Sequence, residues 1–389
     1  MCILTFTEYY LPGYKGGGPL RTLANLSERL GREIELKIVT SDRDLGDKGP
    51  YSGIVTNVWG RVGNAYVRYV SPDHFSFLHL RQLMLETTHD VIYLNSFFSS
   101  RCAIKPLLLR KLRMIRNVPV ILAPRGEFSP GALALKAFKK KLFIKLSRIA
   151  GLYAGIIWQA SSDVEAEDIR RCVGNDLTIF VSPDMAPVVA TSTAPRRKKV
   201  KHQGHLDVVF LSRISRKKNL DGALRLLSNL QGDIRFNIYG PLEDASYWTE
   251  CKRIIDGLSP NITVQYCGSV PHEDVLSVME AHDLFFFPTF GENFGHVILE
   301  AFLAGCPVVI SDQTPWRGLS DKKVGWDIPL SSVADFNSVL QRCVMMDDDE
   351  YRTWSDSARA FGLSQTQDDT VAARNRALFE YALAAAEAA

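Results

Sequence analysis

The segment that decides the fold is residues 285–309, which read FFFPTFGENFGHVILEAFLAGCPVV. An apolar run is followed by a loop with Gly291 and Gly295, then by an apolar stretch of helical length, a glycine and another apolar run. This order predicts strand, loop, helix and strand, the unit from which parallel sheets are built. Glycines let a backbone approach a ligand closely, and the free N–H groups at a helix start bind anions or polyols.

Two carboxylates accompany this loop. Glu292 lies in the loop and Glu300 follows eight residues later, so we expect both on one face of the following helix. Ionised carboxylates only accept hydrogen bonds, which suits them to sugar hydroxyls. The alternative is that Glu292 caps the helix dipole and Glu300 is a surface residue, but Glu300 stands in an otherwise apolar helix.

The rest of the chain repeats the alternation of β-rich apolar runs with amphipathic segments, which predicts an α/β protein with doubly wound parallel sheets. Its 389 residues are too many for one ordinary core, so two domains are expected. A stretch with three prolines, Ser/Thr residues and the basic run Arg196–Lys199 separates two such patterns and predicts a linker. The predicted parts are an N-terminal domain (1–185), the linker (186–205), a C-terminal domain (206–368) and an Ala-rich helix (369–389).

Charge is distributed unevenly along the chain. Residues 1–200 hold 29 Lys and Arg against 17 Asp and Glu, whereas residues 201–389 hold 17 against 26. A basic N-terminal half suggests an anionic partner, and the basic amphipathic segment 133–148 suggests an anionic membrane surface, with an ordinary packed helix as the alternative. Nucleic acid is not expected, because no aromatic residues interleave with the basic ones in a groove pattern.

The compartment is predicted from the cysteines and the N-terminus. The seven cysteines form no C-x-x-C pair and several lie in apolar runs, which indicates buried, reduced thiols. No secretory signal and no run of about 20 apolar residues is evident. We therefore expect a cytoplasmic protein, with a peripheral location on the inner face of the cytoplasmic membrane as the alternative.

A second candidate site begins the C-terminal half, in residues 209–220, which read VFLSRISRKKNL. Cations cluster where a predicted strand ends and a helix begins, an arrangement that suits a diphosphate. We assign this role to Arg213 and Lys218, and expect Arg216 and Lys217 to be solvated. A solvated basic turn without function is the alternative.

These motifs resemble those of retaining glycosyltransferases of family four, which have the GT-B fold. Residues 292–309 match the Glu-x7-Glu signature and the Glu-Ala-x3-Gly-x-Pro-Val-Val run that follows it. The resemblance is strong over 208–310 and only topological over 1–185. It implies two Rossmann-like domains facing across a cleft, with the C-terminal helix returning to the N-terminal domain.

The resemblance also implies roles for residues. Glu292 would contact the donor sugar, Glu300 the nucleotide ribose, and Arg213 and Lys218 the departing nucleoside diphosphate. Further donor-binding candidates are Gly16, Gly17, Gly18, Gly240, Val270, Gly291, Asn293, Phe294 and Gly295.

The N-terminal half departs from the family pattern. Arg125 stands where relatives often have His, and since a guanidinium is no base, its catalytic role would be electrostatic or orienting. Glu127 and Asn95 are candidates for acceptor binding. No general base is evident, and none is needed if the leaving phosphate takes the acceptor's proton.

Neither a metal nor a cofactor is expected. The acidic runs Asp42–Asp44 and Asp347–Glu350 are interpreted as solvated surface. The sequence therefore predicts a retaining, metal-independent hexosyltransferase that moves sugar from a nucleoside-diphosphate sugar to a glycan or lipid-linked acceptor in polysaccharide biosynthesis. Two alternatives remain: a nucleotide-sugar 2-epimerase, which would need acid and base residues not evident here, and a non-catalytic glycan-binding subunit.

Overall fold

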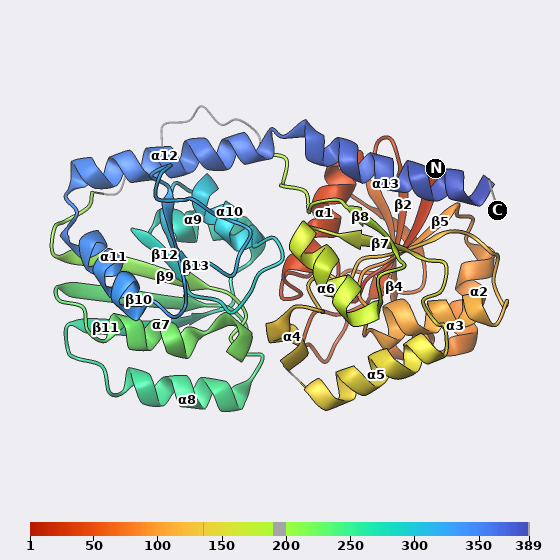
Figure 1. The fold of residues 1–389 in the computed structure, drawn as a ribbon, viewed down its shortest axis with the longest axis horizontal. Helices are drawn as coiled ribbons and strands as arrows, with labels where there is room; N and C mark the ends of the chain where they lie inside the picture. The colour runs from red at the N-terminus through yellow and green to blue at the C-terminus, as the bar shows by residue number, and fades with distance from the viewer. Residues whose placement is uncertain (135, 190–199, 388–389) are drawn as a thin grey trace. The chain divides into compact units, whose positions relative to one another are not determined.

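The computed structural model describes residues 1–387 except 135 and 190–199. The chain divides into two compact units (Figure 1): unit 1 comprises Met1–Val188 and Asp368–Ala389, and unit 2 comprises Val189–Gln367. Each unit is described by itself. The basic run Arg196–Lys199 lies outside the described residues.

Unit 1 is built on an eight-stranded sheet in the order β3-β4-β2-β1-β5-β6-β7-β8, parallel except for the β3–β4 pair. Its inner strands are continuous apolar runs because helices cover both faces of such a sheet. The strands are β1 (Cys2–Phe6), β2 (Glu35–Ser41), β3 (Trp59–Val62), β4 (Ala65–Val70), β5 (Val91–Leu94), β6 (Val120–Leu122), β7 (Ile157–Ala160) and β8 (Thr178–Val181).

The helices of unit 1 include the C-terminal segment of the chain. They are α1 (Gly18–Leu30), α2 (Phe77–Glu86), α3 (Lys105–Lys111), α4 (Pro130–Ala134), α5 (Ala137–Ile149), α6 (Asp163–Val173) and α13 (Asp369–Glu387), with short turns η1 (Pro72–Phe75) and η2 (Ser100–Ile104). Helix α13 buries Leu378, Phe379 and Ala382 in the core that lies against β1 and β2. The expected return of the C-terminal helix is confirmed.

One expectation for unit 1 is wrong in detail, and two elements of unit 1 were missed. The single helix expected over 133–148 is two helices, because Lys136 adopts the left-handed conformation that separates α4 from α5. Helix α6 and edge strand β3 were not expected. The edge strand is short and mostly exposed, so it carries little of the apolar signal on which strand prediction depends.

Unit 2 contains a six-stranded, fully parallel sheet in the order β11-β10-β9-β12-β13-β14. Numbered within the unit, the order is 3-2-1-4-5-6, which is the Rossmann order. Successive strands are added toward one edge of the sheet as far as β11 and toward the other edge from β12 on, so the order reverses between β9 and β12. The strands are β9 (His205–Leu211), β10 (Asp233–Tyr239), β11 (Ile262–Gly268), β12 (Leu284–Phe287), β13 (Val308–Ser311) and β14 (Gly325–Ile328).

The helices of unit 2 are α7 (Leu220–Leu227), α8 (Ala245–Ile255), α9 (His272–Glu280), α10 (His296–Leu303), α11 (Val333–Met345) and α12 (Asp348–Thr366), with a short 3₁₀ turn η3 (Arg216–Lys218). The run Asp347–Glu350 starts α12, where the Asp347 side chain accepts a hydrogen bond from the Glu350 N–H. An α/β chain with two parallel-sheet units is therefore confirmed. No helix among the described residues combines the length and apolar character that crossing a membrane requires.

Candidate functional site

The site lies at the carboxyl ends of β9 and β12 in unit 2, where the strand order reverses. Doubly wound sheets bind ligands at this point because the loops on either side diverge and leave a crevice. Here the two loops are fastened together: the Asn219 side-chain amide donates to the Pro288 carbonyl at 2.8 Å, and the Phe290 N–H donates to the Lys217 carbonyl at 2.9 Å.

At the centre of these loops Lys218 and Glu292 form an ion pair, with 2.5 Å between Nζ and Oε1. The two side chains are only 11% and 13% exposed. Burial raises the pKa of the Glu292 carboxyl, but the charges of Lys218 and Lys217 and the hydrogen bonds from Lys218 and Thr289 outweigh it, so the pKa lies below its ordinary value. Glu292 is therefore an acceptor-only carboxylate held beside a cation.

Lys217 is a residue whose place was predicted wrongly. It is half-buried rather than solvated, and its Cε would lie 3.8 Å from a Cβ added to Gly291. Its neighbour Arg216 is 48% exposed and pairs with Glu250, as expected of a surface residue. Three successive basic residues cannot be told apart by composition; the 3₁₀ turn decides which of them face the loop.

The remaining residues of the loop differ in whether their polar atoms have partners within the protein. Among the described residues, the buried Nδ2 of Asn293 has no hydrogen-bond partner, which marks it as a donor available to a ligand. Phe294 instead has a packing role, since its carbonyl accepts from Trp316 Nε1 at 2.6 Å and the two rings lie 5.5 Å apart. Gly295 ends the loop in the left-handed conformation, and no side chain caps α10.

Glu300 projects from α10 and has a different neighbour from Glu292. His272 Nδ1 lies 3.5 Å from Glu300 Oε1, and the Glu300 side chain is 13% exposed. As expected from the sequence, Glu292 lies in the loop before α10, which begins at His296, and Glu300 lies on the helix itself. His272 carried no motif and was not predicted.

The β9 and β10 loops place the remaining predicted residues of unit 2. Arg213 pairs with Glu243 at 3.1 Å, so it does not join the Lys218 pair. Gly240 is required by packing: its φ is 135°, and a Cβ there would lie 1.8 Å from the Ser212 carbonyl oxygen. Val270 is half-buried in the loop between β11 and α9.

In unit 1 the acidic run after β2 was assigned wrongly to solvated surface. Asp42 and Asp44 are buried. The Asp44 carboxylate accepts hydrogen bonds from the backbone N–H groups of Tyr14 at 2.8 Å and Lys15 at 3.1 Å. It therefore holds the loop that leads into the glycine triplet.

Gly16 and Gly17 lie between β1 and α1, and Gly18 is the first residue of α1. A Cβ on Gly16 would meet that of Tyr9 at 2.8 Å, so this position needs glycine for packing. Gly17 precedes α1 with a φ of 73° and no side-chain cap. The start of α1 thus leaves its first N–H groups to be satisfied by solvent or a ligand.

Arg125 is not a free cation but part of a buried network of hydrogen bonds and an ion pair. Its side chain is 5% exposed and pairs with Asp184 at 2.5 Å. It also donates to Asn95 Oδ1 at 2.8 Å and to the Tyr93 hydroxyl, whose pKa burial raises to about 12. Among the described residues the buried Nδ2 of Asn95 has no partner, so the network leaves the amide nitrogen of Asn95 unused.

Glu127 binds the loop that follows β5. Its carboxylate accepts from the Ser96 hydroxyl at 2.8 Å and from the N–H groups of Phe97 and Phe98 at 2.5 and 3.2 Å. Burial raises the pKa of this carboxyl above its ordinary value, although these hydrogen bonds act in the opposite direction. The structure therefore gives Glu127 loop-holding contacts.

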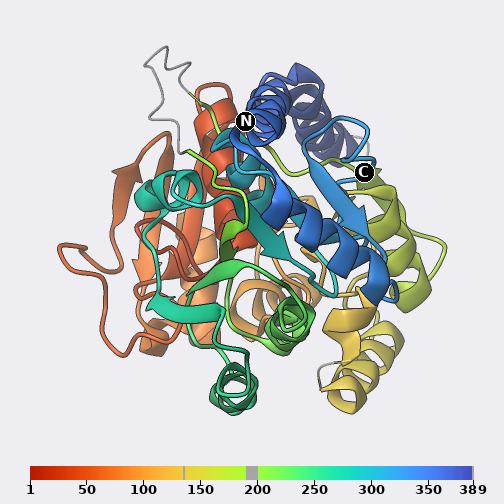
Figure 2. The ribbon, with the colours of Figure 1, turned by 90° about the vertical axis from the view of Figure 1, so that its left-hand side faces the viewer.

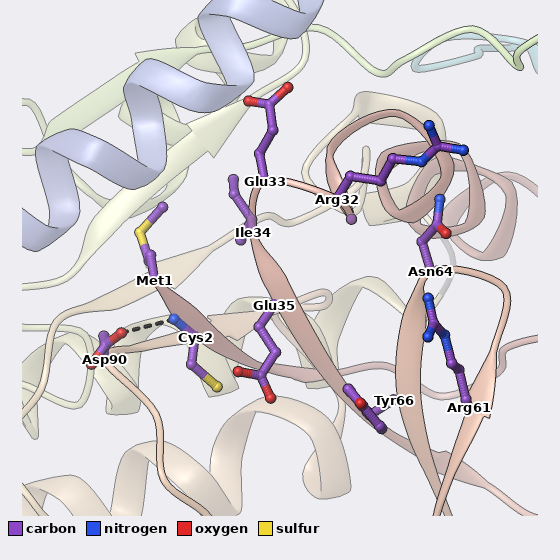
Figure 3. Close-up of a pocket in the computed structure, with 11 residues that line it drawn as sticks. Met1, Cys2, Arg32, Glu33, Ile34, Glu35, Arg61, Asn64, Tyr66 and Asp90 are labelled. Atoms are coloured by element: carbon purple, nitrogen blue, oxygen red, sulfur yellow. Dashed lines mark hydrogen bonds between the residues drawn. The ribbon is translucent and has the colours of Figure 1, made fainter.

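A hollow of about 480 Å³ lies elsewhere on unit 1 (Figure 3). Its walls include Cys2 and Glu35, which begin β1 and β2, and the side chains of Arg32 and Arg61. This is the amino end of the sheet, opposite the end at which doubly wound sheets bind ligands. It is not part of the candidate site.

Comparison with known structures agrees with this architecture. The chain is similar to the sucrose-phosphate synthase of Thermosynechococcus elongatus, with a TM-score of 0.70, 17% identity and 99% of both chains covered. It is also similar to HepE of Anabaena in complex with UDP and glucose, with a TM-score of 0.68, 15% identity and 98% and 99% of the two chains covered. These likenesses, together with the two parallel-sheet units, define a protein of the GT-B fold class.

Residues 192–360 match the model of the family described as glycosyl transferases group 1. A relative from Escherichia coli, the O-antigen chain mannosyltransferase B, is 30% identical over 169 residues. That match covers 41% of this chain and 41% of the relative, so the chain spans about two fifths of the curated relative's length. The family resemblance predicted from the motifs is confirmed.

Proposed function

We propose that this protein is a glycosyltransferase that takes a sugar from a nucleoside-diphosphate sugar and joins it to a glycan or lipid-linked acceptor, with retention at the anomeric carbon. The observation that carries the proposal is the buried Lys218–Glu292 pair at the reversal point of the unit 2 sheet. It combines an ammonium suited to phosphate with a carboxylate suited to hydroxyls, inside the family's own stretch.

The donor would be divided among residues of unit 2. Glu292 and the unpartnered amide of Asn293 would bind sugar hydroxyls, Glu300 the ribose, and Val270 the base. Lys218, Lys217 and Arg213 would neutralise the diphosphate. The UDP in the HepE structure and the mannosyl transfer named for the E. coli relative support a nucleotide-sugar donor.

The chemistry needs few parts. The bond between the anomeric carbon and the diphosphate oxygen breaks while a bond to the acceptor hydroxyl oxygen forms on the same face. The acceptor's proton passes to the departing phosphate oxygen, so no protein base is required. Lys218 stabilises the charge that grows on that oxygen, and a preorganised cation in a water-poor site is effective in this role. We propose that the reaction proceeds without a metal or cofactor.

The acceptor would be handled by unit 1, where Asn95 offers an unused amide donor at the carboxyl end of the sheet. Arg125 then acts as a positioning residue, because its guanidinium fixes the Asn95 oxygen. Glu127 shapes the same loop through its backbone contacts. We propose that the acceptor is a glycan or is lipid-linked, and that the protein works in the cytoplasm on an anionic membrane surface.

The test is nucleotide binding measured by thermal shift and calorimetry with UDP, GDP, ADP and CMP. A ligand at a hundred times its dissociation constant adds about 2.7 kcal/mol of stability. Lys218→Ala and Glu300→Ala should each weaken binding of the preferred nucleotide at least about tenfold, since each removes a charge-assisted contact of 1.5–3 kcal/mol.

The matched control is Arg216→Ala, in the same 3₁₀ turn, because Arg216 is exposed and paired with Glu250. Its affinity should equal that of the wild type. Equal affinities in all four proteins, each shown to be folded by circular dichroism, would remove the site assignment.

A further inference from the structure

Helix α5 has an exposed apolar face. Phe138, Leu142, Leu146 and Ile149 are 80%, 45%, 55% and 75% exposed. They are spaced by four, four and three residues, so they lie along one face of the helix. In Figures 1 and 2 the helix, drawn in yellow, lies at the periphery of unit 1 in both views. Single exposed apolar residues are ordinary, but a stripe of four along one helix is not.

Basic residues border this stripe. The sequence of α5 is AFKKKLFIKLSRI, which contains no acidic residue. Lys139 follows Phe138 and Lys145 precedes Leu146, so the two lysines lie on opposite sides of the stripe. Lys141 and Arg148 are also exposed and lie further round the helix. Beyond the helix, the Lys111 ammonium donates to the Ala150 carbonyl at its C-terminal end. The surface therefore joins an apolar strip to positive charge.

The opposite face of α5 holds the loop that follows β5. The Phe143 ring lies 5.7 Å from that of Phe97 and 5.9 Å from that of Phe98. Lys140 lies with its ammonium 5.0 Å from the centre of the Phe98 ring. Phe97 and Phe98 are the two residues whose backbone N–H groups donate to Glu127. One helix thus connects the exposed stripe to the loop at the carboxyl end of the unit 1 sheet.

We propose that the stripe of α5 lies in the surface of an anionic lipid bilayer and holds the β5 loop there. An occupant must be apolar along a strip and negatively charged on both sides, and an anionic bilayer has both properties over any length. The helix has 13 residues and is about 20 Å long, which is too short to cross a bilayer but suits a helix lying in its plane. The proposal rests on the proposed function in that it takes the β5 loop as the acceptor end of unit 1.

The experiment is co-sedimentation of the full chain with vesicles of phosphatidylcholine alone or with 30% phosphatidylglycerol. The wild type should bind the anionic vesicles and not the neutral ones, with binding that weakens as salt rises. Lys139→Glu with Lys145→Glu should reduce binding at least about 25-fold, since each lysine near the surface contributes about fivefold. Phe138→Ser with Ile149→Ser should reduce it at least about tenfold.

The controls make equal changes elsewhere. Leu78→Ser with Val164→Ser replaces two apolar side chains of unit 1 that are 70% and 73% exposed. Lys48→Glu with Lys323→Glu repeats the charge change. Both control proteins should bind vesicles as the wild type does. Because all the altered side chains are exposed, the variants should fold, which circular dichroism would check.

Three results would overturn the proposal: no binding of the wild type to anionic vesicles, equal binding by all variants, or sedimentation showing a dimer that the stripe variant abolishes. The last would assign the stripe to a second copy of the chain. Nucleotide affinity measured on the same proteins keeps the two proposals separate, since the stripe lies in unit 1 and the donor residues in unit 2. Retained nucleotide binding without vesicle binding would reject only the membrane surface.

Discussion

Breaking the Lys218–Glu292 pair should destabilise unit 2 even without any ligand. Replacing one partner of a fully buried pair costs about 3–5 kcal/mol, because the other charge is left desolvated and unpaired. Here about a tenth of each side chain remains exposed, so we expect about 2–3 kcal/mol for Lys218→Met or Glu292→Gln. The double variant should lose less than the sum of the two, since neither charge is then left alone.

Urea unfolding followed by tryptophan fluorescence would measure this. Four of the six tryptophans, at 248, 316, 326 and 354, lie in unit 2, so they report on its unfolding. With a slope of about 2 kcal/mol/M, each single variant should lower the midpoint by about 1 M. The coupling energy of the cycle should be at least about 1 kcal/mol.

The dependence on pH has a definite sign. The pKa of Glu292 is lowered in the folded state, so its contribution to stability is present above the unfolded carboxyl value of about 4.3 and is lost as the pH falls through the folded value. The difference between wild type and Glu292→Gln should therefore shrink at acidic pH. Single variants whose costs add within about 0.5 kcal/mol would refute the reasoning, because they would show that the two groups do not interact.

Three further outcomes are expected. Gly240→Ala should lower the free energy of unfolding by about 2–4 kcal/mol, and Gly268→Ala by about 1–2 kcal/mol. Both positions have a φ that is unfavourable for alanine, but only at Gly240 does the added Cβ also clash, with Ser212. Equal urea midpoints for the two variants would contradict this. The pKa of Glu127 is raised in the folded state, so its contribution to stability is present below the unfolded value of about 4.3 and is lost as the pH rises through the folded value. Glu127→Gln lacks this loss and should therefore gain stability relative to the wild type as the pH rises above about 4.3. Parallel pH profiles of the two proteins would contradict this. Asn375→Ala should cost about 1–3 kcal/mol and speed hydrogen exchange in α13, since this buried amide donates to the Pro183 carbonyl; unchanged exchange rates would show that the helix is held otherwise.

Parts of the candidate site could be read from local sequence. The glycine-flanked loop with Glu292 and the basic turn with Lys218 each follow a strand of continuous apolar residues, and parallel strands place such loops at one edge of a sheet. The turn could not reveal which of its cations pairs with which acid. That choice depends on the 3₁₀ geometry and on contacts with a loop 72 residues away, where the Thr289 hydroxyl donates to the Lys217 carbonyl.

The burial of charged residues could not be predicted from the sequence. Asp44 and Arg125 are charged, and isolated charges in a sequence are usually at the surface. Both are buried here because each has specific partners: backbone N–H groups for Asp44, and Asp184 with Tyr93 and Asn95 for Arg125. Such partners lie 29 to 59 residues away and leave no periodic signal.

By itself the sequence determined the α/β class, the two parallel-sheet units and the family of the C-terminal half, because apolar periodicity and glycine placement are local properties that the backbone converts directly into strands, turns and helices. Only the tertiary structure decided which charges are paired, that His272 neighbours Glu300, and that one face of α5 is exposed while the other holds the β5 loop. The physical reason is that burial and pairing depend on which side chains meet when distant elements pack, and a helix of alternating lysines and apolar residues has the same sequence whether its apolar face is covered or bare.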